Sequence, residues 1–200
     1  MGMQIVQIVY WLALSTWFGG ALFIAIAWRI IFKTVNEANP ILPTVLSVNL
    51  EGQHGTLLAG TIVGNLLATF QKIELVCCAV LAVALGGQAF LVNLGDRVTL
   101  SFVLVRGVLL ALAALIILYD WRFVWPKLWQ ARQEFLDHAD EPEKANPAKD
   151  RFDSFQRESV TLREMLLFLL LGMVLFSGAA GLAPAVRLNP TEQSHASEPI

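Results

Sequence analysis

The sequence predicts an all-α integral membrane protein, a four-helix bundle, and three observations lead to this prediction. First, 56% of the 200 residues are hydrophobic and only 15% are charged, with a mean hydropathy of +0.61, whereas soluble domains are about 25% charged. Second, four stretches of 21 to 24 residues are almost free of charged side chains. Third, none of these stretches alternates apolar and polar residues as a membrane β-strand does.

Each predicted span is long enough to cross a bilayer, because a helix that rises about 1.5 Å per residue needs about 20 residues to cross a hydrocarbon core of about 30 Å. The spans cover residues 5–28, 75–95, 98–119 and 165–186. No Lys or Arg precedes the first span, and its apolar stretch is longer than that of a signal peptide, so we expect it to remain in the mature protein. Residues 1–187 then form one transmembrane domain, and the polar residues 188–200 are expected to be a disordered tail.

Residues 55–70 are a fifth uncharged stretch, but it has only 16 residues and contains Gly60, Gly64, Asn65 and three threonines. It is short and weakly apolar for an independent span. The sequence leaves open whether it is an interfacial amphipathic helix, a re-entrant segment or a curved extension that leads into the second span.

The distribution of basic residues predicts the orientation of the spans, because Lys and Arg are concentrated in cytoplasmic loops. The amino terminus, the 95–97 hairpin and the carboxyl tail together hold only Arg97 and Arg187. We therefore expect both termini outside and the two larger loops in the cytoplasm, in a bacterial inner (plasma) membrane. Those loops and their helix ends hold Arg29, Lys33, Lys72, Arg122, Lys127, Arg132, Lys144, Lys149, Arg151, Arg157 and Arg163.

Residues 120–135 are expected to continue the third helix and to turn onto the inner membrane surface. Trp121, Trp125 and Trp129 recur at a spacing of four, which predicts one common face at the level of the lipid headgroups. Pro126 predicts a bend in the chain at this point.

The rest of the loop before the fourth span divides into two parts. Residues 137–150 are polar and contain two prolines, which is typical of a mobile linker. Residues 153–164 are predicted to form a charged, cytoplasmic lead-in helix that continues into the fourth span.

Arg106 is the single charge within the third span, eight positions from the outer end of that span. An arginine near the bilayer centre costs from about 3 to more than about 10 kcal/mol, so it should face protein or water and have a partner. Counting to the same depth in the other spans reaches Gln88, Ser15, Thr16 and Ser177, which predicts a polar intramembrane layer with Gln88 as the best-placed partner. Such a layer either locks the bundle through hydrogen bonds or lines a hydrated path.

A second candidate group lies at the predicted inner ends of the spans. Lys72, Glu74 and Asp120 are close to these ends and could form an ion-pair network. The alternative is that they are solvated anchors at helix ends, as charges there usually are.

The sequence predicts no cofactor and no enzymatic activity. The histidines all lie outside the predicted spans, whereas a membrane haem usually needs histidine ligands within the bundle. Cys77 and Cys78 are adjacent, so they point about 100° apart on a helix and do not form a natural metal chelate. No Ser/His/Asp or Cys/His combination lies at a shared membrane depth, and no dense basic run indicates nucleic-acid binding. The histidines are His54, His138 and His195.

Three stretches, in their order along a chain with four spans, resemble the transmembrane protein 205-like membrane domain family. They are residues 17–23 (WFGGALF), 58–62 (LAGTI) and 152–159 (FDSFQRES). The resemblance covers roughly residues 5–185 and implies a four-helix integral membrane protein without an agreed activity. Gln156 stands where the family often has a histidine, so a role that depends on that imidazole is not carried over. The Trp-x-Gly-Gly pattern also resembles copper-resistance membrane domains and a four-helix protoporphyrinogen oxidase, but the spans lack the ligands that those proteins need.

The first functional expectation is a non-enzymatic accessory or subunit protein that acts through association with a membrane-protein partner or as a homo-oligomer in the lipid bilayer. The alternative is a transporter or permeation-type protein with a polar layer around Arg106. A metal- or haem-linked role is the third alternative.

Overall fold

The computed structural model describes residues 2–38, 40, 54–91, 97–138 and 141–182, and these residues contain helices and no strand. The helices are α1 (Gly2–Ala38), α2 (His54–Leu91), α3 (Arg97–Tyr119), α4 (Trp125–Asp137) and α5 (Pro142–Leu182), with a π-helical turn, η2 (Asp120–Val124), between α3 and α4. Four helical rods, counting α3, η2 and α4 as one, are long and apolar enough to cross a membrane. The predicted all-α membrane fold is therefore confirmed. The expected tail 188–200 and the ends of the second and fourth spans lie outside the described residues.

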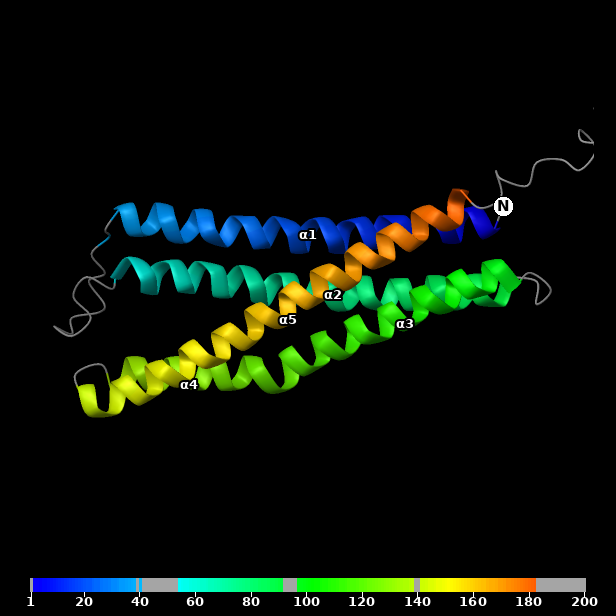
Figure 1. Ribbon diagram of the computed structural model, residues 1–200. Helices are drawn as coiled ribbons and strands as arrows, with labels where there is room; N and C mark the ends of the chain where they lie inside the picture. The colour runs from blue at the N-terminus through cyan, green and yellow to red at the C-terminus, as the bar shows by residue number, and fades with distance from the viewer. Residues whose placement is uncertain (1, 39, 41–53, 92–96, 139–140, 183–200) are drawn as a thin grey trace, which may run out of the picture.

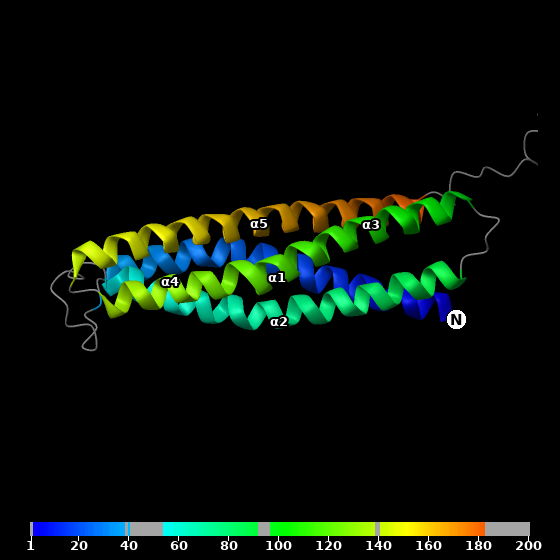
Figure 2. The same ribbon diagram turned by 90° about the horizontal axis from the view of Figure 1, so that it is seen from below.

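The bundle is built from an antiparallel pair, α1 and α2, and a second pair that diverges from it at one end (Figure 1). Gln7 contacts Gln88 near one end of the first pair and Asn36 contacts Thr56 near the other, so α1 and α2 run side by side over their whole length. Helix α5 lies along α4 at one end and beside α3 at the other (Figure 2), where Ser177 of α5 also contacts Tyr10 of α1. We call the end that carries α4 and the first half of α5 the charged end.

Residues 55–70 are the first half of the continuous helix α2. Their contact with α1 is close at Gly20, where the ring of Phe70 occupies the space that a Cβ atom would need. Small residues permit this kind of approach between helices in lipid. Of the alternatives left open by the sequence, an extension continuous with the second span is the one that matches this helix.

The π-helical turn η2 changes the direction of the side chains that follow Asp120. The backbone N–H of Trp125 donates to the carbonyl of Asp120, five residues back, and Pro126 has no N–H to donate to a carbonyl four residues back. The wider turn rotates α4 relative to α3. The rings of Trp125 and Trp129 pack edge to face with their centroids 5.8 Å apart, whereas Trp121 is 50% exposed and lies in a separate surface pocket with Tyr119 and Phe123. The expected common face for all three tryptophans is therefore wrong.

The mobile linker expected at residues 137–150 is also wrong over its second half, because α5 begins at Pro142. A proline fits the first helical position, where the missing N–H would have no partner in the helix. Ala145 and Ala148 are buried, and Arg151 pairs with Glu134 of α4 at 2.9 Å. Packing against α4 thus stabilises helical structure from residue 142, more than two turns before residue 153, where the lead-in helix was expected to start.

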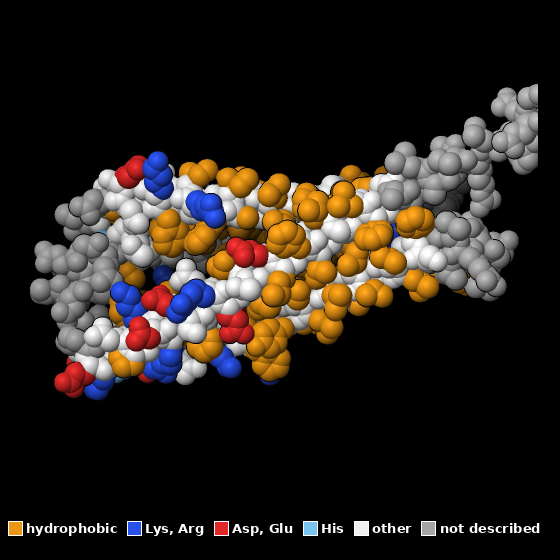
Figure 3. Space-filling view, viewed as in Figure 1, with side chains coloured by type: hydrophobic (Ala, Val, Ile, Leu, Met, Phe, Trp, Pro, Cys, Tyr) orange, Lys and Arg blue, Asp and Glu red, His pale blue; other side chains and the backbone are white. Residues whose placement is uncertain are grey.

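The apolar surface reaches further along α1 and α2 than along the other helices. Exposed large apolar side chains continue to Ile30 on α1 and begin at Ile62 on α2, whereas between Phe123 and Met165 on the other pair only Leu136, at 37%, is exposed. Figure 3 shows this offset as charged side chains on α4 and α5 beside a still apolar α1. The charged end therefore sets polar helices beside apolar ones.

Candidate functional site

Arg106 lies in a buried polar layer and is itself 4% exposed. Its Nη1 atom lies 3.4 Å from Oε1 of Gln88, and its Nε donates to the carbonyl of Phe102 at 3.2 Å. The guanidinium carbon lies 5.5 Å from the centroid of the Tyr10 ring, in the range of a cation–π contact. The structure thus brings together Arg106 and the partner that the sequence placed nearest to it.

Tyr10 and Gln7, which the depth count did not include, complete this layer. The Tyr10 hydroxyl lies 2.7 Å from Oγ of Ser177, which itself donates to the carbonyl of Met173, so Tyr10 is the donor. Gln88 donates to Oε1 of Gln7 at 2.9 Å. The layer therefore connects α1, α2, α3 and α5 through polar side chains.

Ser15 and Thr16 are exposed and do not join the layer. The hydroxyl of Ser15 donates to the carbonyl of Leu12 in its own helix. Tyr10 lies five residues before Ser15, which is about 7.5 Å along the helix, and the rotation of α1 about its axis turns Tyr10 toward the bundle and Ser15 away from it. The one signal for Tyr10 in the sequence was that it is a polar side chain in an otherwise apolar turn.

Glu74 and Asp120 meet in a second group that we call the buried carboxylate cluster: Glu74, Asp120, Ser159 and Arg163. The two carboxylates are 2% and 4% exposed. Arg163 Nη2 lies 3.2 Å from Oδ2 of Asp120 and Nη1 lies 3.7 Å from Oε2 of Glu74. Ser159 donates to the other oxygen of Asp120 at 2.9 Å. The guanidinium of Arg163 therefore pairs with both carboxylates.

The cluster leaves buried polar atoms without a hydrogen-bond partner. Oε1 of Glu74 and Nε of Arg163 both lack one, as do the indole nitrogen of Trp17 and the amide nitrogen of Gln71. The Trp17 indole still interacts with the Glu74 carboxylate, although the contact falls short of hydrogen-bond geometry.

Lys72, the third member of the predicted charge network, is exposed, and Arg163 is the cation that pairs with Glu74 and Asp120. The sequence contained a local signal for this role, since Ser159 and Arg163 are four residues apart and share one face of a helix. Only the packing of α5 against η2, which brings Arg163 within reach of Glu74 on α2, selects them as partners of the two acids.

A cavity of about 690 Å³ opens beside this cluster, between the α1–α2 pair and the α4–α5 pair at the charged end. Volumes of this size are typical of small-molecule sites. Glu74 and Arg163 line it at one end, and the surface is hollowed between α1 and the charged half of α5 (Figure 3). Its walls are mostly apolar and include Ile24, Trp28, Val63, Leu67, Phe70, Trp125, Trp129 and Phe152.

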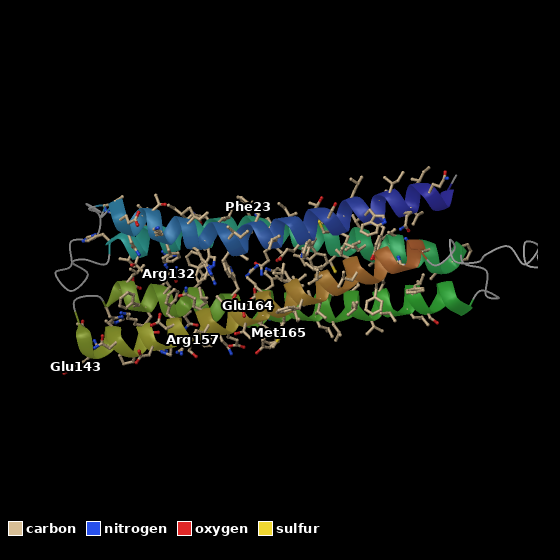
Figure 4. All side chains as sticks on the ribbon, turned by 45° about the horizontal axis from the view of Figure 1, so that its top comes forward. Phe23, Arg132, Glu143, Arg157, Glu164 and Met165 are labelled. Carbon is tan, nitrogen blue, oxygen red and sulfur yellow. The ribbon has the colours of Figure 1, made fainter. Side chains whose placement is uncertain are left out.

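The other end of the cavity is lined by three cations, Arg29, Lys149 and Arg132. Arg132 donates to Oγ1 of Thr61 and its guanidinium carbon lies 5.0 Å from the centroid of the Trp129 ring. Figure 4 shows Arg132 in the space between the two helix pairs, whereas Arg157 and Glu143 lie on the outer side of α5. One acid, Asp153, accompanies these cations in the lining.

Within the described ranges, no three or more His, Cys, Asp or Glu side chains gather in a group that could hold a metal ion. Cys77 and Cys78 are free thiols. Comparison of the chain with family models, curated proteins and solved structures gave no match.

Proposed function

We propose that this membrane protein binds an amphiphilic small molecule in the cavity between its two helix pairs. The observation that carries the proposal is the combination of a 690 Å³ cavity with mostly apolar walls and the buried pair of Glu74 and Arg163 in its lining. Ligand sites are typically apolar clefts with a few polar groups that fix the orientation of the ligand. No catalytic step is part of this proposal.

The cavity supports this role better than the Arg106 layer does. Arg106 lines neither the cavity nor the shallow pocket beside Tyr119. Between the carboxylate cluster and the Arg106 layer lie the buried side chains of Leu14, Trp17 and Leu81, all 0% exposed. A ligand that entered at the charged end would therefore stop at Glu74, which favours binding over passage through the bundle.

The accessory or subunit role remains a prediction that is compatible with ligand binding, since a bound amphiphile can stabilise a subunit or its contact with a partner. The resemblance to the transmembrane protein 205-like family and the location in a bacterial inner membrane also remain predictions.

Gly60 offers a direct test because it lines the cavity, and a Cβ atom added to it meets no atom within 4 Å. Gly60→Leu should narrow the cavity, since its Cβ atom has open space around it. Gly19 is the matched control: it too has no atom within 4 Å of an added Cβ, but it is exposed and does not line the cavity.

The measurement is the number of lipid or detergent molecules that the purified full chain retains, determined by native mass spectrometry. We expect Gly60→Leu to lose bound amphiphile and Gly19→Leu to retain as much as the unchanged protein. Equal retention in all three proteins would show that the cavity is not a binding site.

A further inference from the structure

The two ends of the cavity differ in the charges of the side chains that line them. One end is lined by Arg29, Arg132 and Lys149, and the other by Glu74 and Arg163, with apolar walls between. The buried cluster at the second end has two acids and one base, so it is unfavourable for an anion. The first end has three bases and one acid, Asp153. An anionic group is therefore favoured at the first end only.

The position of the first end follows from the contact between Arg132 and Thr61. Thr61 immediately precedes Ile62, where the exposed apolar surface of α2 begins, and Arg29 immediately precedes Ile30, where that of α1 stops. Arg29 and Arg132, which share the lining of the cavity with Lys149, thus lie where the apolar surface of the α1–α2 pair ends. That is the level at which lipid headgroups meet a membrane protein.

The stretch of α2 beside the cavity is long enough to span one leaflet of a bilayer. Thirteen residues of α2 separate Thr61 from Glu74, which at about 1.5 Å per residue is about 20 Å. Half of a hydrocarbon core is about 15 Å. A chain that enters beside Arg132 would therefore extend along the apolar walls to the carboxylate cluster.

We propose that the occupant of the cavity is a membrane lipid with an anionic headgroup, its headgroup held by Arg29, Arg132 and Lys149 and an acyl chain lying between the two helix pairs. The inference rests on the proposed function and names the class of ligand. Arg132 is held in place for this role, because it stacks on Trp129 and donates to Thr61, so less of its side-chain entropy is lost when it binds.

The experiment compares phosphatidylglycerol with phosphatidylcholine of the same chains, added to the delipidated full chain, and measures the retained lipid by native mass spectrometry. The unchanged protein should prefer phosphatidylglycerol. Each cation near a membrane surface contributes about 1 kcal/mol toward an anionic lipid, so Lys149→Gln and Arg132→Gln should each reduce this preference about fivefold. Arg132→Lys should retain most of the preference, which separates the charge from the packing of Arg132 on Trp129.

Arg157→Gln is the matched control, since Arg157 lies on the outer side of α5 and does not line the cavity (Figure 4). It should leave the preference unchanged. If Arg157→Gln and Lys149→Gln reduced the preference for phosphatidylglycerol equally, the inference would be contradicted, because the preference would then come from the overall positive charge of this end.

The remaining outcomes separate the two proposals. If Gly60→Leu lowers retention of both lipids while Lys149→Gln and Arg132→Gln leave the preference intact, the headgroup assignment is wrong and the cavity remains a binding site. If inorganic phosphate alone displaces phosphatidylglycerol at equal concentration, the cations form a site for a free anion and the lipid assignment is wrong. If Gly60→Leu has no effect on either lipid, both proposals fail.

Discussion

Arg163 of α5 lies 3.7 Å from the carboxylate of Glu74 in the middle of α2, and this pair joins the polar half of one helix to the centre of an apolar one. The second carboxylate, Asp120, lies 3.2 Å from the same guanidinium. The π-helical turn that begins at Asp120 places α4 beside the cavity whose end this pair forms. The most informative variants are therefore those that change one member of the pair at a time.

Arg163→Ala should destabilise the protein strongly, because it leaves Glu74 and Asp120 buried without a cation. Removing one partner of a buried ion pair costs about 3–5 kcal/mol. The free energy of unfolding can be measured by steric trapping in bicelles. Adding Glu74→Gln to Arg163→Ala should recover part of this loss, since one uncompensated charge is then removed.

Lys72→Ala is the control for that series, since Lys72 is adjacent to the cluster in sequence but exposed. It should change the free energy of unfolding by less than about 0.5 kcal/mol. If Lys72→Ala lowered the free energy of unfolding as much as Arg163→Ala does, the overall charge of this end, and not the buried ion pairs, would stabilise the bundle.

Tyr10→Phe should cost about 0.6–1.7 kcal/mol, the range measured for hydrogen bonds between helices in membranes, because it removes the donor to Ser177. A double-mutant cycle with Ser177→Ala isolates this contact. Ser15→Ala should have little effect, since its hydroxyl contacts only its own helix. A coupling energy of zero between Tyr10 and Ser177 would contradict the contact.

Gly20→Ala should destabilise the bundle by about 1–3 kcal/mol, as overpacking does. The ring of Phe70 fills the space of the new methyl group, and Phe70 is itself buried. Gly19→Ala has open space and should be near neutral. Phe70→Leu should reduce the cost of Gly20→Ala, and failure to do so would show that the helices do not approach each other at this pair.

The first turn of α5 should depend on pH through Glu141. Lys144 Nζ lies 2.5 Å from the Glu141 carboxylate, and this hydrogen bond and charge lower the pKa of Glu141. A lowered pKa in the folded state stabilises the turn above the ordinary pKa of the carboxyl, and this contribution is lost as the pH falls through the lowered value.

Hydrogen exchange of the amides of Lys144 and Ala145, which both donate to the carbonyl of Glu141, tests this dependence. In Glu141→Gln these amides should exchange faster than in the unchanged protein at about pH 6. At about pH 2 they should exchange equally fast, because the glutamate at position 141 is then as neutral as the glutamine. A difference that persists at the lower pH would assign the effect to something other than the charge of Glu141.

The sequence by itself determined the class of the protein and the rods from which it is built. Charge-free stretches of more than 20 residues have few alternatives to a membrane helix, because every backbone polar group in lipid must be bonded within the segment. It also placed Gln88 beside Arg106, since α2 and α3 are neighbours in the chain and the depth of a residue follows from counting along a helix. These properties are local, or nearly so.

The tertiary structure decided which side of each rod faces which neighbour. Residue counting gives only an approximate depth and no rotation, so Ser15 was predicted in the layer that Tyr10 occupies. The wider turn at η2 moved Trp121 away from Trp125 and Trp129, which no spacing rule for an α-helix anticipates. Arg163 meets Glu74, and the cavity opens beside them, only because α5 crosses from α4 to α1, and that crossing depends on the shapes of all the helices together.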